Sequence, residues 1–369
     1  MFLIPNLNIG GAEKYVVGLS NALIEHGHEV SICTISQGIS LKKHLNEKVC
    51  HYELGTKSNL SIKKVTQLIR IIKEKDIQIL HSHLFKSDLL NYFASFFNEK
   101  NIVRISTEHS TSSRRKKYKI FGLVQRKIYK RFNAVTAISD SVRNHIINWT
   151  GVNSKKVITI YNGTDMIIRP TAEIIQKVNE MDHSKSSIGT LARLETRKDL
   201  QTSLKAINYL VYQLKFTDFK YTIYGDGPEK GNLESLSTKL KIDKYVHFAG
   251  FSSDIGSLID GFDLHILSSV EEGFGISIIE TMARGIPNIG TDTGGIPEVI
   301  SDNVNGFLFK CGDYEDLANK INFLLNEKKE MINFGISAIN RVESDFTLES
   351  TVNKLLKVYE EEKDKRVIL

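Results

Sequence analysis

The sequence is poor in the residues that crosslink small proteins, bind structural metals or anchor a chain in a membrane. Its 369 residues include three cysteines, five prolines and one tryptophan. Cys33, Cys50 and Cys311 are odd in number, far apart and without metal-ligand spacing, which predicts reduced thiols. No stretch approaches the roughly 20 apolar residues that cross a bilayer, and Pro5 interrupts the start of the chain too early for a signal peptide. We therefore expect a cytoplasmic protein.

The composition is otherwise that of an ordinary folded protein. Hydrophobic residues make up 41% of the chain and charged residues 25%, which excludes a disordered or fibrous protein. A chain of 369 residues exceeds the usual size of a single hydrophobic core, so two domains are expected. The 49 Lys and Arg outnumber the 43 Asp and Glu, for a net charge of +6, so the position of the excess cations matters.

Short β-branched runs alternate along the chain with amphipathic helical patterns. This alternation is typical of parallel sheets and predicts an α/β fold with two doubly wound domains. We expect domains at 1–165 and 184–347, a polar connection between them, and a C-terminal segment 348–369 that begins as a long charged helix. The predicted strands are 1–5, 29–35, 77–81, 102–107, 134–138 and 157–161, then 187–192, 221–224, 245–249, 264–267 and 287–290.

The segment 272–280, EGFGISIIE, carries the strongest chemical pattern. It links the predicted strand 264–267 to a predicted helix, and glycines before a helix expose backbone N–H groups at its positive end, where anions bind. The candidate donor-binding residues in this loop are Gly273, Phe274, Gly275 and Ile276.

Two glutamates flank that loop. Glu272 lies in it, and Glu280 lies about two turns into the helix. One carboxylate can hold ribose hydroxyls and the other can contact sugar hydroxyls. A solvated loop and a helix surface are the alternative, which the glycines between strand and helix disfavour.

Cations and further glycines follow two other strands of the second half. Arg193 and Lys198 come directly after 187–192, where ligands bind in doubly wound sheets and where cations can hold phosphate oxygens. Gly225 and Gly227 follow 221–224 and resemble half of a dinucleotide fingerprint, but the third glycine is out of register, which disfavours a dehydrogenase. A tight structural turn is the alternative for these glycines.

Histidines end two strands of the first domain. His81 and His83 end one strand, and His109 follows the next. A neutral imidazole at a strand end can donate to a sugar hydroxyl or shuttle a proton. We take His109 as a site residue, with a structural role as the alternative for all three.

A basic segment lies between Glu108 and Asp140, where the sequence has no acidic residue. Apolar residues are interleaved at helical spacing, which predicts a basic amphipathic helix over 114–131. Attraction to an anionic membrane or a phosphate-bearing acceptor is one reading, and a solvated face is the other. We expect no nucleic-acid partner, because no recognised module is present. The cations are Arg114, Arg115, Lys116, Lys117, Lys119, Arg126, Lys127, Lys130 and Arg131.

Seven motifs in order over nearly the whole chain resemble the retaining glycosyltransferases of family 4, which have the GT-B fold of two Rossmann-like domains facing a cleft. The fold and the position of the C-terminal helix, which would cross back to the first domain, follow from that resemblance. The motifs begin at Gly10, Thr107, Tyr161, Arg193, Gly225, Glu272 and Gly294.

The resemblance also implies a role for each site residue. Glu280 would bind the donor ribose, Glu272 the sugar, and Arg193 and Lys198 the diphosphate, with backbone help from 273–276. In the first domain, Gly11 would contact the donor through its backbone and His109 would lie near the transferred sugar. The sequence departs from the family pattern at Ala192, Asp199 and Ser268, where we expect altered local backbone and retained activity.

The expected reaction is transfer of a sugar from a UDP- or GDP-sugar to a hydroxyl of a glycan or lipid-linked acceptor, with retention, in cell-surface polysaccharide or glycoconjugate synthesis. No Asp-x-Asp carboxylate pair is present to hold a divalent ion, so neither a metal nor another cofactor is expected. A peripheral position on the inner face of the cell membrane would suit the basic helix. The alternatives are a nucleotide-sugar epimerase on the same fold and a non-catalytic nucleotide-sugar-binding subunit.

Overall fold

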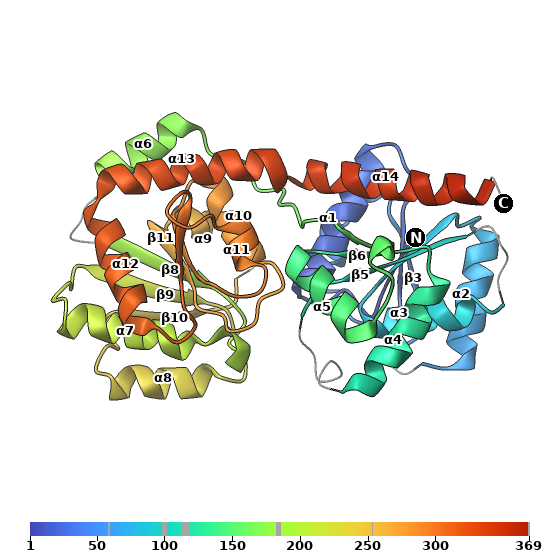
Figure 1. The fold of residues 1–369 in the computed structure, drawn as a ribbon, viewed down its shortest axis with the longest axis horizontal. Coiled ribbons are helices and arrows are strands. Elements are labelled where there is room, and N and C mark those ends of the chain that lie inside the picture. Colours follow the sequence, from blue (N-terminus) through green and yellow to red (C-terminus); the bar gives the residue numbers. More distant parts are fainter. Residues whose placement is uncertain (58–59, 98–101, 112–117, 182–185, 253, 368–369) are drawn as a thin grey trace. The chain divides into compact units, whose positions relative to one another are not determined.

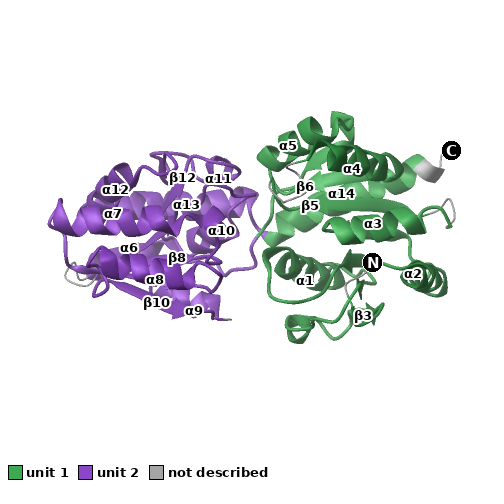
Figure 2. Ribbon diagram, turned by 90° about the horizontal axis from the view of Figure 1, so that it is seen from below, with its two compact units in different colours: residues 1–163, 348–369 green, residues 164–347 purple. Residues whose placement is uncertain are grey.

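The computed structural model describes residues 1–57, 60–97, 102–111, 118–181, 186–252 and 254–367 (Figure 1). The chain forms two compact units (Figure 2). Unit 1 comprises Met1–Gly163 and Leu348–Leu369, and unit 2 comprises Thr164–Thr347. In sequence, unit 2 is therefore an insertion between two parts of unit 1.

Unit 1 is built on a parallel sheet with the strand order β3-β2-β1-β4-β5-β6-β7. Leu3 of the central strand β1 lies opposite Cys33 on one side and Ser82 on the other. The sheet therefore grows outward in both directions from β1 and β4. Its strands are β1 (Phe2–Ile4), β2 (Ser31–Thr34), β3 (Cys50–Glu53), β4 (Ile79–His83), β5 (Val103–Glu108), β6 (Ala134–Ala137) and β7 (Val157–Thr159).

Helices cover both faces of this sheet, because successive strand residues point to opposite sides. Phe2 and Ile4 pack in one core with α1 and α14, whereas Leu3 packs in another with α2 and α3. The helices of unit 1 are α1 (Gly11–Glu25), α2 (Ile62–Glu74), α3 (Phe85–Ala94), α4 (Lys119–Arg131), α5 (Asp140–Thr150) and α14 (Leu348–Val367).

The C-terminal helix α14 is charged but belongs to the core of unit 1 on one face. Val352, Leu355, Val358 and Tyr359 recur at helical spacing and are buried. The hydroxyl of Tyr359 lies 2.7 Å from Nδ1 of His81, so a polar contact also ties α14 to β4. The helix continues past the predicted end near residue 363 to Val367.

Unit 2 is a second doubly wound unit, with the parallel strand order β10-β9-β8-β11-β12-β13. The strands are β8 (Ser186–Leu191), β9 (Phe219–Tyr224), β10 (Val246–Gly250), β11 (Leu264–Leu267), β12 (Asn288–Thr291) and β13 (Gly306–Phe309). The helices are α6 (Thr171–Glu180), α7 (Leu200–Tyr212), α8 (Lys230–Lys239), α9 (Ile255–Asp260), α10 (Ile276–Ala283), α11 (Ile296–Val299), α12 (Tyr314–Asn326) and α13 (Lys328–Asp345).

The two parallel sheets confirm the predicted α/β fold class, and the structure adds three elements. Strands β3 and β13 are edge strands, and β3 carries the polar sequence CHYE, which gives little apolar signal. The stretch expected to be a connection contains α6, whose Ile174 and Val178 are buried in unit 2. Ile174 fits there because Gly285 and Gly335 have no side chain: a Cβ on them would lie 2.3 and 3.0 Å from its atoms.

Candidate functional site

The predicted site residues of unit 2 lie at the topological switch point of its sheet, where the order of successive strands reverses. From β8 the chain builds outward through β9 and β10, and from β11 it builds the other way through β12 and β13. In such sheets ligands bind at the carboxyl ends of the strands beside this switch point. Arg193 and Lys198 follow β8, and Glu272 follows β11. The structure therefore brings together cations and a carboxylate from two distant loops.

An ion pair between Lys198 and Glu272 lies at the centre of this loop cluster. Nζ of Lys198 lies 2.5 Å from Oε2 of Glu272, and each side chain is only 15% exposed. The other carboxylate oxygen accepts the N–H of Gly273 at 3.1 Å. Burial disfavours the ionised carboxylate, but the Lys198 charge and these hydrogen bonds outweigh it and hold the pKa of Glu272 below its ordinary value. The carboxylate of Glu272 is therefore ionised at neutral pH.

Two arginines share one acidic residue beside that pair. Nε of Arg193 lies 3.1 Å from Glu195, and Nε of Arg197 lies 2.7 Å from the same carboxylate. The side chain of Arg193 is 65% exposed, so its guanidinium can reach a phosphate with little desolvation. Arg197 and Glu195 were not among the predicted site residues. The alternation of charge at positions 193, 195 and 197 is the signal that could have found them.

The loop before α10 has the backbone geometry expected of an anion site. Gly275 caps the helix in the left-handed conformation, with φ of 97°, which glycine adopts without strain. The first amides of a helix have no acceptor within it, and here those of Ile276 and Ser277 follow the cap. Phe274 holds the loop in place, since it is buried and packs edge-on against Phe346 with ring centroids 5.4 Å apart.

Glu280 lies about one turn after Ile276, and not about two turns into the helix as predicted, because α10 begins at Ile276. Ile276, Ser277 and Glu280 are partly exposed, whereas Ile278 and Ile279 between them are fully buried. Positions i and i+4 lie one above the other on a helix. Glu280 therefore lies on the face of α10 that begins at the amide groups of Ile276 and Ser277.

The glycines after β9 let two loops approach each other closely. Gly225 has φ of 146°, and a Cβ there would lie 1.9 Å from the carbonyl oxygen of Ala192. A Cβ on Gly227 would lie 2.4 Å from the carbonyl oxygen of Leu194. The N–H of Leu194 in turn donates to the carbonyl of Asp226 at 3.0 Å. Both glycines thus allow the loop after β9 to pack closely against the backbone on either side of Arg193. The alternative interpretation of these glycines, a tight structural turn, would require the same close packing.

Two of the three positions that depart from the family pattern have local explanations. Asp199 adopts a left-handed conformation with φ of 42°, and its carboxylate accepts the hydroxyl of Thr202 at 2.6 Å. The Ser268 hydroxyl is buried and lies 3.1 and 2.9 Å from the carbonyls of Lys198 and Asp199. Ser268 therefore fastens the end of β11 to the loop that carries Lys198.

In unit 1 the predicted site residues follow β1 and β5, and the switch point lies between β1 and β4. Gly11 is the exposed first residue of α1, which comes after β1. His109 follows β5 and is partly exposed. His81 and His83 are 1% and 0% exposed, so they do not present a ring to solvent. His81 has a structural role, between the hydroxyls of Tyr359 and Thr107 at 2.7 Å each.

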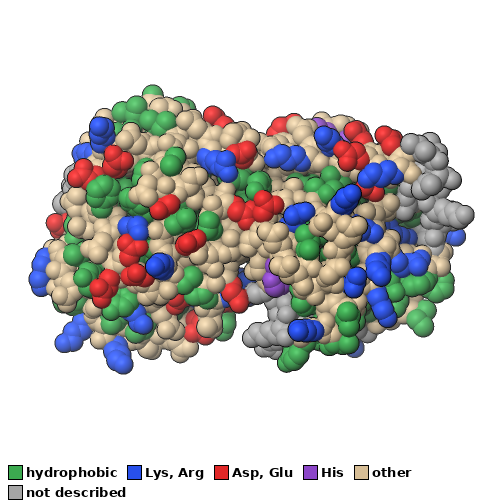
Figure 3. Space-filling model, in the orientation of Figure 1, with side chains coloured by type: hydrophobic (Ala, Val, Ile, Leu, Met, Phe, Trp, Pro, Cys, Tyr) green, Lys and Arg blue, Asp and Glu red, His purple; other side chains and the backbone are tan. Residues whose placement is uncertain are grey.

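The basic segment is a helix where the structure describes it. Arg114–Lys117 lie outside the described residues, and α4 begins at Lys119. Ile128 and Phe132 are buried, but Ile120 is 63% exposed and Leu123 54% exposed. The outer face of α4 is therefore both basic and apolar, and Figure 3 shows basic and hydrophobic side chains together over α3 and α4.

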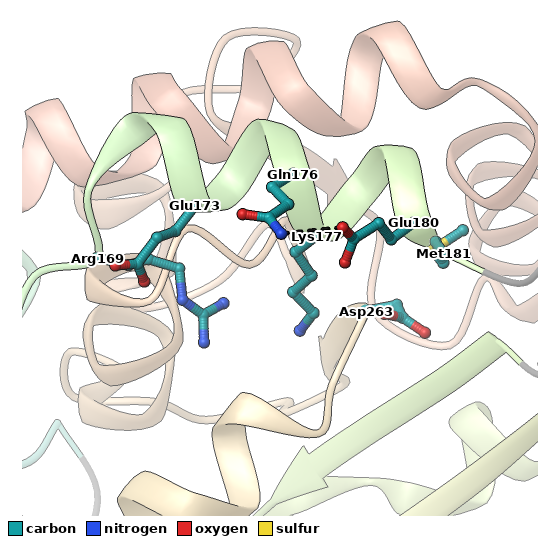
Figure 4. A pocket seen from close by; sticks show the side chains of 7 residues that line it. All are labelled: Arg169, Glu173, Gln176, Lys177, Glu180, Met181 and Asp263. Carbon is teal, nitrogen blue, oxygen red and sulfur yellow. Dashed lines mark hydrogen bonds between the residues drawn. The ribbon is translucent and has the colours of Figure 1, made fainter.

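A pocket of about 470 Å³ lies elsewhere in unit 2, along α6 (Figure 4). Asp263 in its wall precedes β11, so the pocket belongs to the amino ends of the strands, away from the loops that carry the predicted site. Its cations are engaged: Arg169 pairs with Asp260 at 2.5 Å, and Lys177 donates to the carbonyls of Asp260 and Phe262. These contacts fasten α6 to unit 2.

The described residues contain neither a metal-binding cluster nor a helix that could span a membrane. No group of three or more His, Cys, Asp or Glu side chains in that part of the chain could hold a metal ion. Within the same residues, no helix combines the length and apolarity needed to cross a membrane.

Comparison with known proteins agrees with the sequence motifs and the fold. Residues 9–166 match the family model "Glycosyltransferase Family 4", and residues 171–341 match "Glycosyl transferases group 1". The chain is 27% identical to N-acetyl-alpha-D-glucosaminyl L-malate synthase of Bacillus anthracis, over 95% of this chain and 94% of that protein.

Two further similarities extend the comparison. The chain is 29% identical to a Campylobacter jejuni alpha-1,4-N-acetyl-D-galactosaminyltransferase named for a diphosphoundecaprenol-linked saccharide, over 90% of this chain and 91% of that one. In fold it resembles Anabaena HepE, solved in complex with UDP, with a TM-score of 0.82, 21% identity and coverage of 98% and 99%.

Proposed function

Since this chain belongs to the family 4 glycosyltransferases and has the GT-B fold, we propose that it transfers a sugar from a UDP- or GDP-sugar to an acceptor hydroxyl with retention at the anomeric carbon. The observation that carries the proposal is the Lys198–Glu272 pair at the switch point of unit 2. A lysine there has three N–H donors, so it can bind a diphosphate oxygen while it keeps its contact with Glu272.

The charges of the unit 2 site suit a diphosphate leaving group. Lys198 and the amides at the start of α10 are held in place before the reaction, and the exposed Arg193 lies in the same loop as Lys198, so together they can stabilise negative charge as it grows on the leaving group. In this proposal Glu280 holds the ribose hydroxyls, and Glu272 contacts the hydroxyls of the transferred sugar. From unit 1, His109 lies near that sugar and the Gly11 amide contacts the donor.

The proposed acceptor is a glycan or a lipid-linked saccharide at an anionic membrane surface. One relative is named for a diphosphoundecaprenol-linked substrate, and the outer face of α4 combines exposed Ile120 and Leu123 with lysines. At the end of α3, Phe93, Phe96 and Phe97 are also exposed, and the guanidinium of Arg131 at the end of α4 lies 4.1 Å from the ring of Phe96. Apolar side chains beside cations bind the headgroup region of anionic bilayers. We propose a cytoplasmic enzyme that docks peripherally on the inner face of the cell membrane in surface-polysaccharide synthesis.

Two successive experiments test the identity of the sugar donor and the stereochemistry of the transfer. A thermal-shift screen of UDP- and GDP-sugars identifies the donor, and NMR of the product's anomeric coupling then assigns the linkage. An α-linked donor should give an α-linked product. An inverted product would overturn the retaining mechanism.

Two outcomes would support the alternative functions. Interconversion of donor sugars without acceptor would show an epimerase, and donor binding without turnover across a broad acceptor panel would show a binding subunit.

The proposed reaction runs without a metal ion, because cationic side chains neutralise the diphosphate charge that a carboxylate-bound metal would otherwise neutralise. Initial rates should be the same with and without excess chelator. A collapse in the rate that Mg²⁺ or Mn²⁺ restores would overturn this part of the proposal.

A further inference from the structure

His83 and His109 form a direct ring-to-ring contact in unit 1. Nδ1 of His83 lies 2.9 Å from Nε2 of His109, which is hydrogen-bonding distance. His109 is partly exposed at the end of β5, whereas His83 at the end of β4 has no exposed surface. One of the two rings must donate a proton to the other, so the contact constrains the tautomers of both.

The surroundings of His83 keep its ring neutral. His81 stacks on it with centroids 4.5 Å apart, and the rings of Phe2 and Tyr15 lie 5.5 and 6.0 Å away. Burial lowers the pKa of His83 well below its ordinary value, and the neighbouring His81 and His109 lower it further. His83 therefore carries a single ring proton, on either Nδ1 or Nε2.

The second nitrogen of His83 decides between these two arrangements. Nε2 is buried and has no hydrogen-bond partner among the described residues. If His109 donated to His83, the proton of His83 would be on Nε2, as a buried donor without an acceptor. Both arrangements leave Nε2 without a partner, but buried N–H groups without an acceptor are rarer in folded proteins than buried acceptors without a donor. If His83 donates from Nδ1, its proton is satisfied, and the second proton of the pair lies on the partly exposed ring.

We propose that His83 is a positioning residue that donates from Nδ1 to Nε2 of His109 and so fixes His109 as the tautomer with its proton on Nδ1. His109 then carries its ring proton on Nδ1, and its ring orientation is set by a buried partner. In this tautomer Nδ1 is protonated and Nε2 accepts from His83, so the ring does not remove a proton from the substrate. This role rests on the proposed function, in which His109 contacts the transferred sugar.

The tautomer can be measured directly in the full-length protein. Long-range ¹H–¹⁵N NMR distinguishes protonated from unprotonated ring nitrogens, and we expect His109 to show a protonated Nδ1 and an unprotonated Nε2. The reverse pattern, with the proton on Nε2, would overturn the proposal. This measurement needs no activity, so it separates the tautomer from the proposed function, which instead fails if the wild-type enzyme transfers no sugar from any donor.

Kinetics of two His83 variants test the positioning role. His83→Leu should lower kcat about ten- to a hundredfold with little change in donor KM, because a loosened His109 loses its alignment with the reacting sugar. His83→Asn should recover most of that loss, since its side-chain amide can donate from a similar position. His51→Leu, in the edge strand β3, is the matched control and should behave as wild type. Equal rates for His83→Leu and wild type would contradict the proposal, and so would equal losses in the Leu and Asn variants with unchanged nucleotide binding.

Discussion

At the scale of single residues, the Lys198–Glu272 pair concentrates opposite charges in a partly buried position. An isolated ion pair of this kind adds little to stability, because desolvation of both groups offsets their attraction. Its position beside the α10 amides instead suits ligand binding: an arriving diphosphate adds two negative charges near a lysine that is already held in place. The pair therefore favours a binding role over a purely structural one.

A lysine substitution tests this role. Lys198→Met should weaken binding of the preferred nucleoside diphosphate about tenfold or more, since a charge-assisted hydrogen bond contributes about 1.5–3 kcal/mol. Binding of the corresponding nucleoside, which lacks phosphate, should not change. Isothermal titration calorimetry measures both. Lys205→Met on the exposed side of α7 is the control, and an equal loss for nucleoside and diphosphate would rule out a phosphate contact.

At the scale of elements, a buried carboxyl holds α3 and α4 on the sheet of unit 1. Asp88 accepts the hydroxyls of Ser82 and Ser106 at 2.7 Å each, and the side-chain amide of Gln125 at 3.0 Å. Burial, with the nearby Glu108 charge, raises the pKa of Asp88 to about 7. In the unfolded chain its pKa returns to an ordinary value near 3.8. The folded state therefore binds more protons than the unfolded state between these two values.

This linkage predicts a stability change with pH. The stabilisation that comes from the raised pKa is complete below pH 3.8 and is lost as the pH rises through about 7. From pH 5 to pH 8, the free energy of unfolding of the wild type should fall by about 3 kcal/mol relative to that of Asp88→Asn. Asn fits the site because a flipped Gln125 can accept its amide through Oε1, which has no partner among the described residues. Denaturant unfolding at each pH measures the difference, and parallel curves for the two proteins would refute the linkage.

The exposed face of α4 leads to a second prediction at this scale. Ile120→Ser with Leu123→Ser should reduce sedimentation with phosphatidylglycerol vesicles by about tenfold, because two apolar side chains that enter the interface are lost. Donor binding should remain, since unit 2 is unchanged. Val304→Ser, which removes an apolar side chain 57% exposed in unit 2, is the matched control. Undiminished vesicle binding by the double variant at low salt would exclude α4 as the docking surface.

At the scale of the whole molecule, the chain forms unit 1, leaves it to form unit 2, and returns through α14. If the nucleotide binds unit 2 alone, it stabilises that unit by mass action, about 2.7 kcal/mol at a concentration of 100 Kd. Hydrogen exchange of full-length protein should then slow up to about a hundredfold in peptides from β8, β11 and α10. Peptides from β1, β4 and α14 should exchange at their original rates. Equal slowing in both units would show that they unfold as one body or that the nucleotide also binds unit 1.

The sequence by itself determined most of the strands and which polar residues follow them. Those features depend on local alternation of apolar residues and on glycines before helices, as at β11 and α10, so neighbours in the chain are sufficient to reveal them. The edge strand β3 and the helix α6 were missed for the same reason. One has a polar sequence, and the other is stabilised by glycines more than 100 residues away, Gly285 and Gly335.

Only the tertiary structure decided which of these residues meet. Lys198 and Glu272 are 74 residues apart, and His83 and His109 are 26 residues apart. Their contacts depend on the order of strands in each sheet, which many sequences with the same local pattern could arrange differently. Burial also depends on the tertiary structure. In the sequence, His81 and His83 come at the end of a predicted strand, where a catalytic histidine could equally lie, and only the structure shows that both are buried. It is the packing of α14 through Tyr359, 278 residues away from His81, that gives His81 a structural role.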